Sequence, residues 1–256
     1  MAFTFHNRNL INTSSQIYLS SGSGTAINLF DRKTNSKWTS VGESTDGTTA
    51  TVSIVFNSAT AISDIILVNH NFSAFNIIYD SNTANRFTPD LSVTGNTFSN
   101  TSYSVGTTTV NSIDINIWNT HIADTEKFLG ELTITKGSLV VFGTNPNSAS
   151  YRPLKRTIGI ERQLLDGGTI NIRNDEKFSA DITLDIVNTQ TFIDLNSTWD
   201  SNSPFLFVPF PNTYTANFEG TVKEVVWTGD FDIGQYRQNK ISGGYRGNIT
   251  LRETPR

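Results

Sequence analysis

The stretch that decides the fold is INLFDRKTNSKWTS, residues 27–40. Its apolar start, Ile27 and Leu29, leads to Asp31, and a polar run then separates Asp31 from Trp38. A large aromatic residue directly after a polar turn is typical of a loop that folds back onto a β-sandwich and is anchored there. We therefore expect Trp38 to be an anchor in a β-rich domain.

The composition points the same way, because Thr, Ser, Asn, Ile, Val and Phe dominate and strands and turns favour these residues. Three segments alternate apolar and polar residues: ATVSIVF (50–56), SIDINIW (112–118) and ELTITKG (131–137). The run IIL (65–67) is typical of a strand buried on both faces. Short alternating strands separated by polar turns predict an antiparallel sandwich.

The order of these pieces resembles the discoidin-like (coagulation factor 5/8 C-terminal type) galactose-binding domains. The resemblance begins at residues 27–40 and continues through VSIVF (52–56), ISDIILVNHN (62–71) and FLGELTI (128–134). It implies a jelly-roll β-sandwich over residues 27–145. The Ser- and Gly-rich segment 1–26 is interpreted either as a mobile arm or as a segment that orders only against a neighbouring subunit.

Charge and cysteine content exclude several classes of protein. The formal net charge of −4 lacks the basic excess of a nucleic-acid binder, so no sequence readout of nucleic acid is expected. The absence of cysteine excludes a disulfide-stapled module, cysteine metal sites and cysteine nucleophiles. The N-terminal sequence lacks a signal-peptide pattern, and no apolar run is long enough for a membrane span. We therefore expect a soluble protein made in a cytoplasm.

The resemblance also implies a structural calcium site. In that family the leading Asp, an acidic or amide residue two positions later and a Glu near the last strand hold the ion. Asp31 and Glu131 match the first and last of these, but position 33 is Lys, and an ammonium cannot bind a hard cation. We expect Lys33 to pair with Asp31 or Glu131 in place of calcium, so no metal or other cofactor is predicted. The alternative is that Lys33 points to solvent.

A glycan contact is the second candidate site. Asn69, His70 and Asn71 follow the buried run IILV, where a strand end delivers polar side chains to a loop rim. We expect these three residues, with Phe72, Arg86 and the loop 81–102, to contact a host-surface glycan. The alternative is that both Asn side chains bond their own turn and His70 is a structural donor. No hydrolase, P-loop or dinucleotide motif is present, so no catalytic residues and no enzyme activity are predicted.

A boundary is predicted near residues 143–153, where Pro, Asn and Ser cluster. Residues 152–256 are expected to form a β-rich domain with one helix near 189–200, because Phe192, Leu195 and Trp199 share a helical face. The runs FVPFPNTY and GGYRGNITLRE resemble bacteriophage tail structural proteins, which implies a tail-tube-like or distal-tail-like domain.

This second resemblance implies a structural virion protein of a phage tail or baseplate, assembled in the host cytoplasm with other tail proteins as a homo-oligomeric ring. Apolar residues that prolines prevent from pairing as a strand, together with nearby arginines, make up the expected subunit interface: Phe205, Phe207, Phe210, Arg152 and Arg156. The alternative is a free carbohydrate-binding module or an accessory fragment of a glycan-active enzyme.

Overall fold

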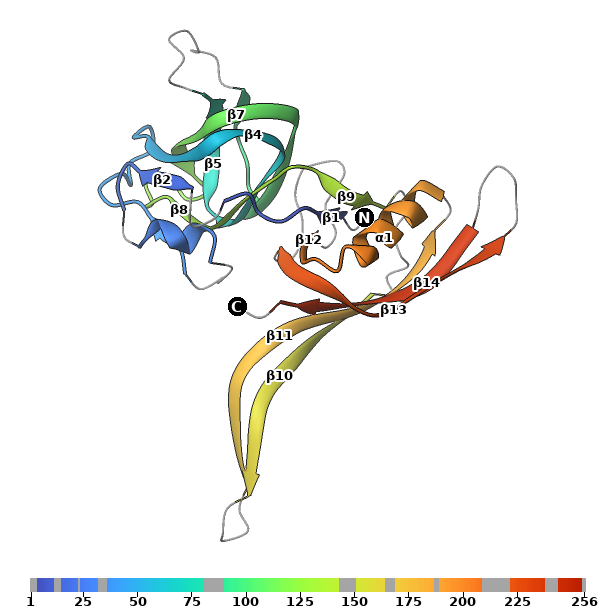
Figure 1. The fold of residues 1–256 in the computed structure, drawn as a ribbon. Helices are drawn as coiled ribbons and strands as arrows, with labels where there is room; N and C mark the ends of the chain where they lie inside the picture. The colour runs from blue at the N-terminus through green and yellow to red at the C-terminus, as the bar shows by residue number, and fades with distance from the viewer. Residues whose placement is uncertain are drawn as a thin grey trace. The chain divides into compact units, whose positions relative to one another are not determined.

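The computed structural model describes residues 4–11, 15–22, 24–31, 36–80, 90–142, 151–163, 169–186, 189–208, 222–237 and 244–254. The chain divides into two compact units. The N-terminal unit comprises His6–Ser138 and Val208–Val222, and the C-terminal unit comprises Met1–Phe5, Leu139–Phe207 and Lys223–Arg256. Both are mainly β with antiparallel strands, as the composition predicts (Figure 1).

The N-terminal unit is built on a sheet with the strand order β3-β8-β4-β7-β5-β6, and β2 pairs with β4 outside this path. Its strands are β2 (Gln16–Leu19), β3 (Trp38–Thr39), β4 (Ala50–His70), β5 (Phe72–Tyr79), β6 (Leu91–Val93), β7 (Asn100–Thr120) and β8 (Phe128–Thr135). A short 3₁₀ helix, Ala26–Leu29, precedes β3. The order is that of an antiparallel β-sandwich unit, which confirms the predicted fold class.

The long strands β4 and β7 pair with each other along most of their 21 residues. Their register shifts between Val55 and Thr60 and again between Ile62 and Asp64, and such shifts let a long strand bend. Figure 1 shows both as strongly curved ribbons. Their inward side chains join those of the other strands in one core, which includes Trp38, Ile54, Ile65, Phe75, Ile115 and Leu132.

Trp38 anchors the N-terminal unit as predicted. Its side chain is fully buried, and its indole N–H donates to the carbonyl of Ser21 at 2.8 Å. Gly22 lies directly against this bond, because a Cβ placed there would sit 2.2 Å from the indole nitrogen. The segment around Ser21 is therefore held by its own domain.

Both interpretations of the segment 1–26 need correction for its described part. Gln16–Leu19 pairs antiparallel with Val52–Val55 of β4, so this stretch orders against its own chain. Thr4 and Phe5 belong to the C-terminal unit, where β1 (Thr4–His6) lies between β12 and β9 in the sheet order. Backbone pairing explains the order of this polar stretch, whose composition alone suggested mobility.

The C-terminal unit carries a sheet with the order β10-β11-β14-β13-β12-β1-β9. Its further strands are β9 (Ser138–Val141), β10 (Tyr151–Gln163), β11 (Thr169–Ile186), β12 (Phe205–Val208), β13 (Lys223–Arg237) and β14 (Gly244–Glu253). Of the predicted boundary, 143–153, residues 143–150 lie outside the described residues and residues 151–153 are the start of β10.

The helix predicted near 189–200 is confirmed, because α1 spans Thr189–Asp200. Leu195 is buried, and the Phe192 ring stacks on Tyr245 of β14 with 4.2 Å between centroids. The indole N–H of Trp199 donates to the carbonyl of Gly229 in β13 at 3.1 Å. The apolar face read from the sequence thus packs α1 against two strands of the sheet.

No helix in the described part of the chain is long and apolar enough to cross a membrane.

The predicted subunit interface is wrong for Phe205 and Phe207. Both side chains are buried in their own chain, on β12, which pairs with β13. The Phe205 ring lies 4.6 Å from that of Phe5, and Phe207 stacks on Phe178 at 5.9 Å. The apolar run that seemed to need a partner is therefore an interior strand of the unit's own sheet, between β13 and β1.

The other proposed interface residues remain predictions. Phe210 lies outside the described residues. Arg152 and Arg156 lie on the described backbone of β10, where their Cα partners on β11 are Asp181 and Lys177.

The hairpin of β10 and β11 extends beyond the rest of its sheet. Residues 151–163 pair with residues 169–182, but β14 covers β11 only over residues 179–186. The outer part, residues 155–163 and 169–178, is a two-stranded ribbon without a third strand in the described structure, and Figure 1 shows it projecting from the sheet. A two-stranded ribbon is marginally stable in water and leaves backbone groups unpaired on both edges.

The contact between Gly22 and Trp38 gives the first testable prediction. Gly22→Ala should lower the free energy of unfolding by about 2–4 kcal/mol, because the new methyl group meets the indole and the backbone φ of +142° disfavours any side chain. Gly106→Ala is the matched control, since its φ is also positive but no atom lies near its Cβ position. We expect that control to cost about 1 kcal/mol in a chemical denaturation series. Equal losses for both variants would contradict the anchoring role of Trp38.

Candidate ligand-binding rim

His70, the last residue of β4, is a structural histidine. Its side chain is fully buried, and its Nδ1 accepts the backbone N–H of Phe72 at 3.1 Å. The ring proton is therefore on Nε2, which lies 3.0 Å from the hydroxyl of Thr101. Burial and then the nearby His121 lower the pKa of His70 to about 3. The predicted contact between His70 and a glycan is wrong, since the ring is enclosed and both nitrogens are engaged.

The neighbours of His70 also face the interior. Asn71 donates from Nδ2 to the carbonyl of Glu126 at 2.8 Å, and its Oδ1 accepts the backbone N–H of Phe128 at 2.9 Å. Phe72 is fully buried. The glycan contacts predicted for Asn71 and Phe72 are therefore wrong as well. Asn69 is half-buried at a φ of +54°, and Arg86 lies outside the described residues, so those two stay predictions.

The residues at the end of β4 instead hold three neighbouring loops in place: 40–49, 94–99 and 121–127. We call the surface that these loops form the rim. Asn96 fastens loop 94–99, because its Nδ2 donates to the carbonyl of Phe72 at 2.7 Å and its Oδ1 accepts the N–H of Phe98 at 3.2 Å. His121 starts the next loop with its backbone N–H on the carbonyl of Asn71, 2.8 Å away. Its ring Nε2 lies 3.4 Å from Asn96 Nδ2.

Two carboxylates join loops 40–49 and 121–127. Glu126 accepts the hydroxyl of Ser40 at 2.7 Å and the N–H of Gly42 at 3.3 Å. Asp124 accepts the N–H of Asp46 at 2.9 Å. These acidic side chains therefore hold loop backbone in place, so the rim is a prearranged surface.

Apolar side chains stand exposed on this rim. Phe98 is 48% exposed, Ile122 is 71% exposed and Val41 is 58% exposed. Burial lowers the pKa of His121, although a bond to the backbone of Phe72 opposes this, so its imidazole is neutral near pH 7. Exposed hydroxyl residues Thr97 and Ser99 flank Phe98 in the sequence. The rim thus combines an aromatic face, hydroxyl groups and a neutral imidazole.

Part of this rim falls in the loop 81–102 that the sequence analysis named. The signal within that loop is TGNTFS, an aromatic residue in a turn of Gly, Asn and Thr. No comparable signal in the sequence marks His121, because the three histidines are scattered and their spacing indicates no metal site.

The proposed replacement of calcium by Lys33 remains a prediction, because Lys33 lies outside the described residues. Asp31 accepts the hydroxyl of Ser36 at 2.6 Å, and Glu131 is buried on β8. In the described ranges, no group of three or more His, Cys, Asp or Glu residues is placed to hold a metal ion.

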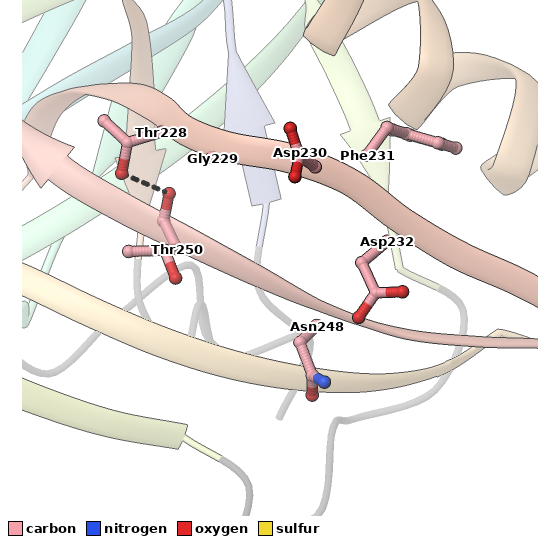
Figure 2. Close-up of a pocket in the computed structure, with 7 residues that line it drawn as sticks. All are labelled: Thr228, Gly229, Asp230, Phe231, Asp232, Asn248 and Thr250. Carbon is pink, nitrogen blue, oxygen red and sulfur yellow. Dashed lines mark hydrogen bonds between the residues drawn. The ribbon is translucent and has the colours of Figure 1, made fainter.

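A hollow of about 400 Å³ lies at a bulge of β13 in the C-terminal unit (Figure 2). Three residues, 229–231, stand between Thr228 and Asp232, whose partners on β14 are Thr250 and Asn248. Three polar residues here bond within the sheet: Thr228 donates to the Thr250 carbonyl at 3.3 Å, Thr250 donates to Asp181 of β11 at 2.8 Å, and Asn248 accepts from Thr183 of β11 at 2.8 Å. Because the sheet already uses these groups, we assign no ligand to this hollow.

Comparisons with known proteins find likeness in structure alone. No protein-family model matches the sequence, and no curated protein matches it. CpGH89CBM32-6 from Clostridium perfringens is similar at 18% identity, with 50% of this chain and 99% of that chain covered and a TM-score of 0.42.

Two further solved structures are similar. Chitosan-binding module 1 of a Paenibacillus sp. IK-5 chitosanase/glucanase has 17% identity and a TM-score of 0.40, with coverage of 47% of this chain and 94% of that chain. CpGH89CBM32-5 from C. perfringens, in complex with GalNAc-β-1,3-galactose, has 11% identity and a TM-score of 0.41, with coverage of 48% and 95%. Likeness at this level assigns no ligand to this chain, and none of these structures is a phage tail or baseplate protein.

The buried His70 predicts acid sensitivity. Its pKa of about 3 lies below the ordinary value of 6.5, so between these limits the unfolded chain binds a proton that the folded chain excludes. Its contribution to stability is complete above pH 6.5 and declines by roughly 1.4 kcal/mol per pH unit as the pH falls toward 3.

His70→Asn is the matched variant, because Asn does not titrate and its Oδ1 can accept the N–H of Phe72. Urea denaturation from pH 7 to pH 4 should show a shallower pH dependence for this variant than for the wild type. Identical slopes would show that His70 titrates normally in the folded state.

Proposed function

We propose that the N-terminal unit is a carbohydrate-binding module and that its rim, the loops 40–49, 94–99 and 121–127, binds the sugar. The observation that carries this proposal is the exposed ring of Phe98 on a loop that Asn96 holds in place, since Asn96 accepts the Phe98 N–H and lies 3.4 Å from the imidazole of His121. The discoidin-like resemblance of residues 27–40 supports the same class of ligand.

The chemistry of the rim suits a neutral sugar. A pyranose ring has an apolar face that packs on an aromatic side chain, while its hydroxyls need short polar partners. Phe98 offers the ring, and Thr97 and Ser99 offer hydroxyls next to it. Asp124 and Glu126 are engaged with loop 40–49, so they are occupied in holding the surface. We therefore propose binding rather than hydrolysis.

A glycan array tests this function. The wild type should be retained on at least one neutral glycan, and Phe98→Ala should weaken that binding about tenfold or more, since the loss of a stacking face costs on the order of 1.4 kcal/mol. Tyr18→Ala is the matched control, because Tyr18 is a similarly exposed aromatic residue, 57% exposed, on β2. Absence of wild-type binding to every glycan, or equal losses for both variants, would reject the proposal.

A second candidate function is a structural subunit of a larger assembly, which includes the phage tail ring that the sequence resemblance implied. Its support is the ribbon of residues 155–163 and 169–178, whose two outer edges have no partner strand among the described residues. An edge of β10 in one subunit and an edge of β11 in the next are different surfaces, and repeated contacts between different surfaces give a ring when the rotation between subunits closes and an open filament when it does not. Because Phe205 and Phe207 are buried, we place the proposed interface on this ribbon and not on β12.

Shortening the ribbon tests the assembly. Arg156 and Lys177 are Cα partners, so joining them through Asn-Gly gives a tight hairpin without residues 157–176. In sedimentation velocity over a range of concentrations, the wild type should form oligomers and the shortened protein should stay monomeric. Phe98→Ala is the control and should assemble as the wild type does. A wild type that is monomeric at all concentrations, or a shortened protein that still assembles, would reject this role.

A further inference from the structure

Lys127 is a fully buried lysine directly before β8. Its Nζ donates to two backbone carbonyls of one loop, those of Glu43 and Thr45, the latter at 3.1 Å. Its own backbone is fixed as well, because its N–H donates to the Ser40 hydroxyl at 3.0 Å and its carbonyl accepts the Ser40 N–H at 2.8 Å. The ammonium is thus brought to a defined point beneath loop 40–49.

No carboxylate in the described structure forms an ion pair with Lys127. The nearby acidic side chains have other partners: Glu43 accepts the Ser20 hydroxyl at 3.2 Å, and Glu126 accepts from Ser40 and Gly42. A buried charge that lacks a counter-charge is costly, so the carbonyl dipoles must supply much of its stabilisation. Such a cluster of carbonyls around a dry positive charge has the chemistry of a cation site.

We propose that the backbone of residues 43–45 is a monovalent-cation site and that its resident cation is the ammonium of Lys127. The carbonyls of residues i and i+2 point at one centre, which orders the loop around that centre. A lysine ammonium brings three donors and a positive charge to these two carbonyls, whereas a hydroxyl brings one donor and an amide two, both without charge. The site is independent of the carbohydrate proposal, since no step here involves a sugar.

The proposal predicts that the site accepts a free cation of the same chemistry when the side chain is removed. Lys127→Ala deletes a propylammonium group, so propylammonium is the probe that restores both charge and volume. We expect Lys127→Ala to melt at a lower temperature than the wild type and to regain part of that loss in propylammonium. Propanol, which has a similar shape but no charge, and tetramethylammonium, which has charge but no N–H, should restore nothing.

Lys127→Met is the second variant, because it fills the same volume without a charge and keeps the core packed. Amide hydrogen exchange of the full chain reads out the loop directly. The N–H groups of Asp46 and Gly47 should exchange about tenfold faster or more in Lys127→Met, while the core amides of β4 and β7 remain protected, since local opening leaves the rest of the fold closed. The wild type should keep its melting temperature in a chelator of divalent metals, because its cation is covalently attached.

Three results would overturn the proposal. Propanol could rescue Lys127→Ala as well as propylammonium does, which would make the role one of filling volume. Lys127→Met could keep wild-type exchange at Asp46 and Gly47, which would show that the ammonium does not order the loop. If Lys127→Ala fails to fold, the Lys127→Met exchange result decides alone. Faster exchange at Asp46 and Gly47 of the wild type in a chelator of divalent metals would show that a metal, not the ammonium, orders this loop.

Discussion

The N-terminal unit depends on one hydrogen bond, from the indole N–H of Trp38 to the carbonyl of Ser21. The indole is fully buried, and an unpaired indole N–H there would cost more than the bond itself contributes. It holds Ser21 against Trp38 of β3. The pairing of β2 with β4 orders the residues just before Ser21. Gly22 lets the two backbones come this close. Without the bond, the stretch after β2 would lose this link to the core, although the pairing of β2 with β4 would remain.

Hydrogen bonds from buried side chains to backbone groups also order the rim. Buried polar residues at the strand ends are used to satisfy loop backbone: His70 holds Phe72, Asn71 holds Phe128, and Lys127 holds Glu43 and Thr45. Each replaces a bond that the loop would otherwise make with water. Loops that are satisfied from below keep a fixed shape, which leaves their tips free to carry exposed side chains such as Phe98 and Ile122. The groups that build the surface are therefore different from the groups that a ligand would meet.

This difference explains what the sequence could and could not predict. Alternation over 50–56 and 112–118 predicted one part each of strands β4 and β7, and the Phe192, Leu195 and Trp199 spacing predicted α1, because periodic burial is a local property. The direction in which the side chains of His70 and Asn71 point is not determined by the local sequence. It depends on a bend between β4 and β5 that turns both side chains inward, toward β7 and the loop before β8. Likewise, Phe205 and Phe207 looked unpartnered because their partners, Phe5 and Phe178, lie far away in the sequence.

The acidic and basic residues follow a related rule. A composition with 16% charged residues leaves few charges to place, and the rim uses three of them, Asp124, Glu126 and Lys127, to hold one loop. The two carboxylates act at the solvent-facing side, where water screens them, and the ammonium acts from the buried side, where carbonyl dipoles are most effective. Loop 40–49 also carries Glu43 and Asp46, so the rim has four acidic residues and one basic residue, and its net charge is negative. A neutral ligand suits such a surface better than an anionic one, because binding it disturbs none of the charges that keep the loops in place.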